Sequence, residues 1–385
     1  MLISDLNIYS NFDRSFYSAD IRIENGIITD IGKLTPAPGE ICEEGGGAYV
    51  LPGLVDVHTH GIMGEDWCLS DNEGFERMVT SYACAGVTSV MPTLSSAPLE
   101  KMLEATELVN SYKSGTGADL LGVHWEGRYL NLQKKGAHAS ELIKPLEPTE
   151  LDSEPLKNAK RLHISAAYEL DRDGSFVKKA AHIGATMGLA HTMATYSEAK
   201  LAEERGITSY THLFNAMPPL HHRDGGTIAA AFEGDRYAEL ICDGIHISPE
   251  MVRLALKNLG VERLSLISDS LSATCLPDGD YFSSGLPVTV KDGICRTPEG
   301  ALAGSTITLD MAVRNLMSFC AIPLTEAIIS ATETPARQIG AFDECGSLEV
   351  GKRANMLFIS SPDALDIRRV MVGGRYITCK KTVED

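Results

Sequence analysis

Eight short apolar runs, each followed by a stretch of helical character, constrain the fold of this 385-residue chain more than any other feature. The apolar runs lie at residues 54–57, 86–93, 120–124, 161–167, 185–191, 208–213, 238–243 and 263–268. The stretches between them carry helix-start signals, such as the capping box Thr195–Glu198 and the cap-and-proline pair Ser248–Pro249. Eight strand–helix units are the number that closes a (β/α)8 TIM barrel. The sequence therefore predicts an α/β protein built on such a barrel.

The two ends of the chain differ from this pattern. Residues 1–50 contain strand-like runs around an Asn25–Gly26 turn, and residues 350–385 contain similar runs around Gly373–Gly374. Neither end has enough strands to bury a core alone, so we expect the two to form one small β-sandwich domain. Residues 51–349 then form the catalytic barrel domain, with two further helices near 306–319 and 324–336.

Composition excludes several classes of protein. The formal net charge is −18, which argues against nucleic acid or an anionic membrane surface as a partner. The 9 cysteines include no C-x-x-C pair, so zinc ribbons and disulfide scaffolds are not expected. The first residues lack the pattern of a signal peptide, and no apolar run approaches the roughly 20 residues of a membrane span. We expect a cytoplasmic protein.

Polar residues cluster at the carboxyl ends of the predicted strands, where functional residues of such barrels lie. They are His58 and His60 after the first strand, Glu126 after the third, His191 after the fifth, His212 after the sixth and Asp269 after the eighth. Imidazole and carboxylate ligands without a thiolate suit zinc, iron or a similar divalent ion in a catalytic site. The sequence therefore predicts a divalent metal centre. Asp269, alone at the last strand end, is the candidate general acid and base.

The same residues carry a resemblance to a known family. The first-strand motif and the strand-end ligands resemble the amidohydrolase superfamily of metal-dependent hydrolases. Several longer stretches resemble, more narrowly, the N-acetylglucosamine-6-phosphate deacetylase family within it. These stretches are His124–Gly127, Lys134–His138, Ala194–Ala199, Thr211–Met217, Asp243–His246 and Leu302–Thr306. The likeness covers nearly the whole chain in the right order.

The resemblance implies a role for each ligand. Glu126, His191 and His212 are expected to bind the principal metal ion. His58, His60 and Asp269 are expected to hold a second ion, with Glu126 bridging the two. His138 is expected to polarise the acetyl carbonyl of an N-acetyl hexosamine 6-phosphate while Asp269 moves the proton. The products are acetate and the amino sugar phosphate, a step in amino-sugar catabolism.

The resemblance also implies how the sugar phosphate is held. Backbone N–H groups of Asn215 and Ala216, together with His246, are expected to bind it. Arg223 is expected to reach the phosphate bound by a neighbouring subunit, which implies a homodimer. One departure from the family stands out, because Arg128 replaces the usual proline beside Glu126 and could add an anion contact of its own.

Three alternatives stay open. The substrate could be the galactosamine isomer rather than the glucosamine one. The chain could be a cyclic amidase, although the fourth strand, residues 161–169, offers no lysine for the carboxylated bridge that many such enzymes use. It could also be a non-catalytic scaffold, although no ligand is missing. The sequence leaves undecided the identity of the metal and whether one or two ions bind.

Overall fold

Eight parallel strands form the centre of the computed structural model, which describes residues 1–113 and 115–379. In order around the sheet they are β5 (Leu54–Thr59), β8 (Val87–Leu94), β10 (Val123–Glu126), β11 (Leu162–Ala166), β12 (Thr186–Leu189), β13 (Ser209–Tyr210), β14 (Tyr237–Ile241) and β15 (Leu264–Ile267). Just beyond β15, the backbone N–H of Asp269 donates to the carbonyl of His58 at 3.0 Å and links the last strand to the first. The predicted barrel is confirmed, strand for strand.

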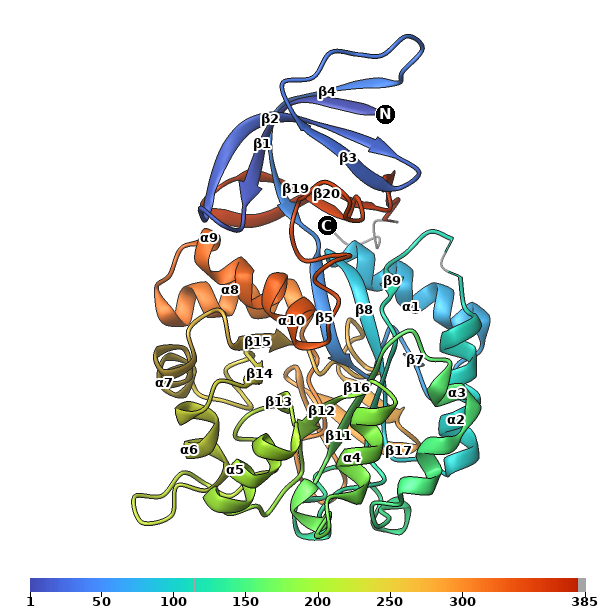
Figure 1. Cartoon of the computed structure of the whole chain (residues 1–385), viewed down its shortest axis with the longest axis vertical. Helices are drawn as coiled ribbons and strands as arrows, with labels where there is room; N and C mark the ends of the chain where they lie inside the picture. Colours follow the sequence, from blue (N-terminus) through green and yellow to red (C-terminus); the bar gives the residue numbers. More distant parts are fainter. Residues whose placement is uncertain (114, 380–385) are drawn as a thin grey trace.

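Helices surround this barrel (Figure 1). They are α1 (Asn72–Cys84), α2 (Leu99–Ser111), α3 (Glu154–Lys157), α4 (Ser175–His182), α5 (Tyr196–Arg205), α6 (Gly226–Glu233), α7 (Pro249–Leu259), α8 (Leu309–Cys320), α9 (Leu324–Ala327) and α10 (Glu333–Gln338). Short 3-10 turns occur at Leu132–Lys134, Ser140–Leu142, Pro148–Asp152, Tyr168–Leu170 and Ile328–Ala331. The capping box Thr195–Glu198 forms at the start of α5 as predicted. Ser248 occupies the N-cap of α7 but makes no capping bond with its side chain.

The helix expected over 324–336 is interrupted. The chain instead forms α9, a 3-10 turn and α10, with the break at Thr332. Two local causes account for this. The Thr332 hydroxyl donates to the carbonyl of Ile328 at 2.7 Å, and Pro335 has no N–H to donate to the carbonyl four residues earlier.

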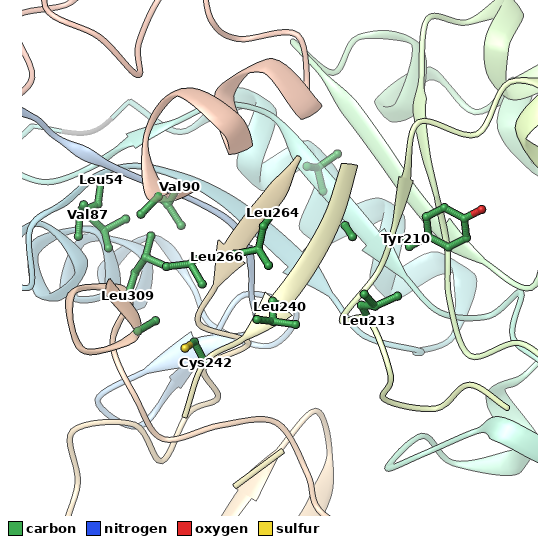
Figure 2. Packing of buried hydrophobic residues seen from close by; sticks show 14 of the residues in the cluster. Leu54, Val87, Val90, Tyr210, Leu213, Leu240, Cys242, Leu264, Leu266 and Leu309 are labelled. Carbon is green, nitrogen blue, oxygen red and sulfur yellow. The ribbon is translucent and has the colours of Figure 1, made fainter. Parts of the chain in front are cut away.

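Apolar side chains on the outer face of the barrel pack against the helices. Figure 2 shows Leu264 and Leu266 of β15 close to Leu240 of β14, with Leu309 of α8 nearby. All four are fully buried. Burial of one such leucine is worth about 1.5–3 kcal/mol, so this layer fixes the strands whose ends carry the polar residues.

The two chain ends form a separate seven-stranded sheet, in the order β21 (Arg375–Tyr376), β20 (Ala364–Val372), β19 (Met356–Ser361), β4 (Cys42–Pro52), β1 (Leu2–Ser10), β2 (Ser15–Glu24) and β3 (Ile27–Gly32). The Asn25–Gly26 hairpin is confirmed, with both residues at positive φ (51° and 81°) as a tight turn between twisted strands requires. Figure 1 shows this sheet at the end of the barrel where β5 begins, away from the carboxyl ends of the strands. The domain limits near residues 50 and 350 stay a prediction.

A three-stranded antiparallel sheet follows β15 and was not expected from the sequence. It contains β16 (Gly279–Ser283), β17 (Leu286–Lys291) and β18 (Ile294–Arg296). Val288 and Val290 alternate inward and pack with Leu271 and Ala303 in a small cluster of their own. The sequence does carry a local signal for the second turn, because Val288 and Val290 alternate with polar residues before Asp292–Gly293, but our sequence analysis did not assign strands to this segment. Three shorter strands, β6 (Gly61–Ile62), β7 (Glu65–Asp66) and β9 (Asp119–Leu120), complete the list.

One disulfide was also unexpected. Cys84, at the end of α1, is bonded to Cys379 near the end of the chain, 295 residues later, and the other seven cysteines are free. The sequence analysis expected no disulfide scaffold, and it did not anticipate this single bond. Within residues 1–113 and 115–379, no helix combines the length and apolar character needed to cross a membrane.

Candidate functional site

Glu126, His191 and His212 converge on one point at the carboxyl end of the barrel. Glu126 Oε1 lies 2.9 Å from His212 Nε2 and 3.2 Å from His191 Nε2, and the two Nε2 atoms are 3.1 Å apart. Ligand atoms bound tetrahedrally about 2.1 Å from one ion lie about 3.4 Å from one another. The three side chains are nearly fully buried, at 3–6% exposure. This geometry fits a metal centre, and the structure brings together the three residues expected to form it.

The second predicted group lies directly beside the first. His58 Nε2 and His60 Nε2 are 3.3 Å apart, and Asp269 Oδ1 lies 3.5 Å and 3.2 Å from them. Glu126 Oε2 is 3.5 Å from His58 Nε2 and 3.2 Å from His60 Nε2. The two oxygens of Glu126 therefore face the two groups separately, as a bridging carboxylate must.

Three of these residues have unusual backbone conformations. His191, His212 and Asp269 have φ values of 43°, 31° and 48°, in the left-handed region that side-chain-bearing residues rarely adopt. Each stands two residues beyond the end of its strand, β12, β13 or β15, and its side chain lines the cavity at the mouth of the barrel. Such strain costs on the order of 1–3 kcal/mol per residue and is typical of functional sites.

The Nδ1 atoms of three candidate histidine ligands each contact a different oxygen atom. His58 Nδ1 lies 3.0 Å from Glu239 Oε2, His60 Nδ1 lies 2.9 Å from Ser95 Oγ, and His191 Nδ1 lies 2.7 Å from the carbonyl of Lys134. Contacts of this kind fix the ring orientation and leave Nε2 as the ligand atom. Sequence analysis missed Ser95 and Glu239. Ser95 follows the second strand end, a position worth noting in any barrel, whereas Glu239 lies within a strand and gave no signal.

Electrostatic coupling within the centre is strong. Burial raises the pKa of Glu126, but the imidazoles of His58, His191 and His212 outweigh it and hold this pKa well below its ordinary value. Burial also raises the pKa of Asp269, and His58 and His60 again bring it below the ordinary value. Both carboxylates are therefore anionic at neutral pH, as metal ligands must be.

His138 lies at the edge of the centre. Its Nε2 is 3.8 Å from Glu126 Oε2, and its Nδ1 is 2.9 Å from Ser96 Oγ. Burial, followed by the repulsion of His191, lowers the pKa of His138 to about 3, so the ring is neutral. A neutral imidazole held in this way can donate one hydrogen bond without bringing a charge. Ser96 is a second residue that sequence analysis missed, again at the second strand end.

A cavity of about 220 Å³ opens above the ligands. Asn215, Ala216 and His246 line one part of it, as expected. Asp243 orients His246, since its Oδ2 lies 2.7 Å from His246 Nδ1 and its Oδ1 accepts the backbone N–H of His246 at 2.8 Å.

The unexpected hairpin of β16 and β17 forms another wall of this cavity. Ser283, Ser284, Leu286 and Val288 line it. The turn is fastened to the barrel, because the Ser284 N–H donates to Asp66 at 2.9 Å and its hydroxyl lies 2.9 Å from that of Ser95. The hairpin thus covers the centre and contacts the residue that orients His60.

Two arginines lie outside the cavity. Arg128 is 7% exposed, and its guanidinium donates to Glu150 at 2.9 Å, so its charge is already paired. The suggestion that Arg128 contacts an anion is therefore not supported by its geometry.

Arg223 is exposed on the loop before α6, which Figure 1 shows projecting from the lower edge of the barrel. It does not line the cavity of its own subunit, and its role in a neighbouring one stays a prediction.

Comparison with known proteins agrees with this picture. The chain is 33% identical to the N-acetylglucosamine-6-phosphate deacetylase of Vibrio furnissii over 332 residues, 85% of this chain and 82% of the relative. It is 32% identical to the N-acetylgalactosamine-6-phosphate deacetylase of Escherichia coli O157:H7 over 360 residues, 92% and 93% of the two chains.

Solved structures give the same result. A variant of the Mycobacterium smegmatis N-acetyl-D-glucosamine-6-phosphate deacetylase, in complex with N-acetyl-D-glucosamine 6-phosphate, superposes with a TM-score of 0.87 at 28% identity and covers 98% of this chain and 99% of that one. Residues 49–377 match the profile of the Amidohydrolase family. The match spans the whole barrel and the C-terminal strands β19, β20 and β21 of the terminal sheet, and the chain belongs to the amidohydrolase family.

Proposed function

We propose that this protein is a metal-dependent deacetylase that hydrolyses the N-acetyl group of N-acetylglucosamine 6-phosphate to glucosamine 6-phosphate and acetate. The observation that carries the proposal is the position of Glu126 between two groups of ligands, directly beneath a cavity lined by Asn215, Ala216 and His246. The similarity to deacetylases of this substrate class supports it.

The residues present fit a divalent ion such as zinc or iron. Glu126, His191 and His212 would hold one ion, and His58, His60 and Asp269 would hold a second with Glu126 between them. When bound, such an ion polarises the acetyl carbonyl and lowers the pKa of a water molecule to about 7. The choice between zinc and iron, and between one ion and two, stays open.

Asp269 would move the proton. Its carboxylate is anionic and can therefore accept a proton from the attacking water, and Asp269 lines the cavity beside His60. The same group would then deliver the proton to the nitrogen of the leaving amine. Because one carboxylate would both accept the proton from water and give it to the amine, no second acidic residue is required.

His138 would orient the carbonyl. If the Ser96 hydroxyl donates to Nδ1, the ring proton lies on Nε2, on the side of the ring that faces Glu126. A donor at this position would stabilise the negative charge that develops on the carbonyl oxygen as the water attacks.

Substrate binding would use the opposite part of the cavity. The backbone N–H groups of Asn215 and Ala216 and the ring of His246 would hold the sugar phosphate. Arg223 would complete the phosphate site of a neighbouring subunit in a homodimer, which would supply the positive charge that a protein of net charge −18 needs for an anionic substrate. The homodimer and the cytoplasmic location stay predictions.

The galactosamine isomer is the second candidate substrate. The similarity to the N-acetylgalactosamine-6-phosphate deacetylase extends over 92% of this chain at 32% identity, comparable to the similarity to the glucosamine enzymes. The two substrates differ only in the direction of the hydroxyl at C4.

Acetate release from the two N-acetyl hexosamine 6-phosphates, measured side by side with protein of known metal content, tests the proposal. A kcat/KM at least tenfold higher for the glucosamine isomer supports it, and the reverse preference selects the second candidate. Bound metal with no acetate from either sugar would reject deacetylation and favour a cyclic amide substrate.

A further inference from the structure

Glu239 is a fully buried carboxylate beneath the metal centre. It lies on β14 with 0% of its surface exposed. Within residues 1–113 and 115–379, its ion-pair partners are two imidazoles, His58 at 3.0 Å and His163 at 3.8 Å, and no lysine or arginine lies within ion-pair distance. A buried carboxylate without a compensating positive charge is costly, so its presence here requires an explanation.

Two side chains share the carboxylate. His58 Nδ1 lies 3.0 Å from Oε2, and Gln338 of α10 donates from Nε2 to Oε1 at 2.6 Å. Gln338 comes from the segment after the barrel, so two distant parts of the chain hold Glu239 in one orientation. The carboxylate is thus pre-positioned against the ring of His58.

Glu239 distinguishes His58 from the other candidate ligands. The Nδ1 atoms of His60 and His191 face a hydroxyl and a backbone carbonyl, and His212 Nδ1 has no partner among the described residues. Only His58, of these four rings, faces a carboxylate. A carboxylate partner makes an imidazole a stronger donor of its Nε2 lone pair than a neutral partner does.

We propose that Glu239 is a positioning residue that sets how tightly the His58 side of the centre holds a divalent ion. It fixes the ring proton of His58 on Nδ1, which leaves the Nε2 lone pair for the ion, and it adds negative charge to that side alone. This inference rests on one part of the proposed function, namely that these residues bind a divalent ion. It does not depend on which sugar is hydrolysed. Whether one or two ions bind would then depend on Glu239.

The variant Glu239→Gln isolates this effect. The amide has the shape of the carboxylate and keeps an acceptor for His58 Nδ1. Its new NH2 group would face Gln338, whose own Oε1 has no partner among the described residues. A flip of the Gln338 amide would therefore satisfy the new donor, and the substitution removes the charge with little disturbance of the packing.

The experiment is a titration of metal-free protein with Zn²⁺ in competition with a chromophoric chelator, together with elemental analysis. We expect two classes of site in the wild type. Glu239→Gln should weaken one class roughly 10–100-fold and leave the other within about twofold. Glu239→Asp, which withdraws the charge by one methylene, should weaken the same class. Substrate is absent throughout, so failure of the deacetylase assay would not affect this result.

The matched control is Glu203→Gln. Glu203 is also a buried glutamate, 6% exposed on α5, and its Oε1 accepts the hydroxyl of Tyr210 at 2.6 Å. Its other oxygen pairs with Lys200 of the same helix, and none of its described hydrogen bonds or ion pairs is to a candidate ligand. This variant should bind Zn²⁺ as the wild type does. Unchanged binding in Glu239→Gln, equal weakening of both classes, or a single class of site in the wild type would each overturn the proposal.

A double-mutant cycle with His58→Asn separates positioning from a general structural effect. Asparagine keeps an N–H donor toward Glu239 but removes the Nε2 ligand atom. If Glu239 acts through His58, adding Glu239→Gln to His58→Asn should change Zn²⁺ affinity by less than about twofold. A further loss as large as in the single variant would show that Glu239 acts by another route. Circular dichroism and thermal unfolding of the metal-free variants confirm that each is folded.

Discussion

Asp269→Asn is the sharpest test of the proposed chemistry. Asp269 has a φ of 48°, a conformation that asparagine adopts as readily as aspartate and that alanine adopts only at a cost of roughly 1–2 kcal/mol. The asparagine variant therefore keeps the backbone and the size of the side chain. It removes the charge and the ability to accept a proton, and because Asp269 is also a proposed ligand, metal content is measured on both proteins. An alanine variant would mix loss of chemistry with backbone strain.

The expected loss follows from the position of the group. Oδ1 lies 3.2 Å from His60 Nε2, at the cavity mouth, so it is within proton-transfer reach of a water held between the ligands. Loss of a positioned general base and acid lowers kcat roughly 10²–10⁴-fold, which corresponds to about 2.7–5.4 kcal/mol of activation free energy. We expect a loss of that size for Asp269→Asn in acetate release, with Zn²⁺ at saturating concentration.

The pH profile provides an independent check. Because the folded protein lowers the pKa of Asp269, the carboxylate form persists above that pKa and is lost as the pH falls through it. The acidic limb of kcat/KM should therefore lie below the ordinary aspartate value of about 3.9 and should disappear in Asp269→Asn. A loss of kcat below tenfold, or an unchanged acidic limb, would refute the assignment.

A matched control is available in Asp171→Asn. Asp171 is a buried aspartate, 5% exposed, that caps α4 by accepting the N–H groups of Phe176 and Val177. Its replacement should lower the free energy of unfolding by on the order of 1 kcal/mol and leave kcat unchanged. Any comparable loss of kcat in this control would show that buried aspartates affect activity through stability alone.

Further predictions follow from other residues. His138→Gln should lower kcat 10²–10³-fold with metal content unchanged, because His138 contacts the centre without being a proposed ligand. Arg223→Ala should raise KM at least tenfold for the 6-phosphate and leave the rate measured on N-acetylglucosamine equal to that of the wild type, because it would lose only a phosphate contact. Thiol titration in denaturant should give seven thiols per chain before reduction and nine after it, because Cys84 and Cys379 are paired.

The contrary results are equally definite. Loss of metal from His138→Gln would make His138 a ligand. An equal effect of Arg223→Ala on KM for the 6-phosphate and for N-acetylglucosamine would show that Arg223 does not contact the phosphate. An unchanged KM for the 6-phosphate would show that it does not bind substrate at all. Nine thiols without reduction would show that the Cys84–Cys379 bond is absent in solution.

The barrel and its ligands could be predicted from the sequence because their signals are local. Each strand is a short apolar run, and the carboxyl ends of parallel strands meet at one face whatever the details of packing. His58, His191 and His212 could therefore be placed in one site although they are far apart in the chain. The Asn25–Gly26 hairpin was predictable for the same reason, since two adjacent residues determine the turn.

Other features depend on contacts that no local pattern encodes. Glu239 meets His58 across 181 residues, and Ser284 meets Asp66 across 218. Arg128 could be identified as a departure from the family, but its pairing with Glu150 depends on how the intervening loop folds back. The position of the β16–β17 hairpin over the cavity likewise depends on contacts with residues distant in the sequence.

The sequence by itself thus determined the fold class and predicted the candidate ligands, because strand periodicity and the donor atoms of each side chain are properties of the residues themselves. The reaction chemistry was predicted from the resemblance of these motifs to a known family. Only the tertiary structure decided which carboxylate orients which imidazole, that a hairpin closes over the cavity, and that Arg128 is already paired. The physical reason is that these outcomes depend on distances of about 3 Å between residues remote in sequence. Such distances are set by the packing of the whole barrel and not by any one segment.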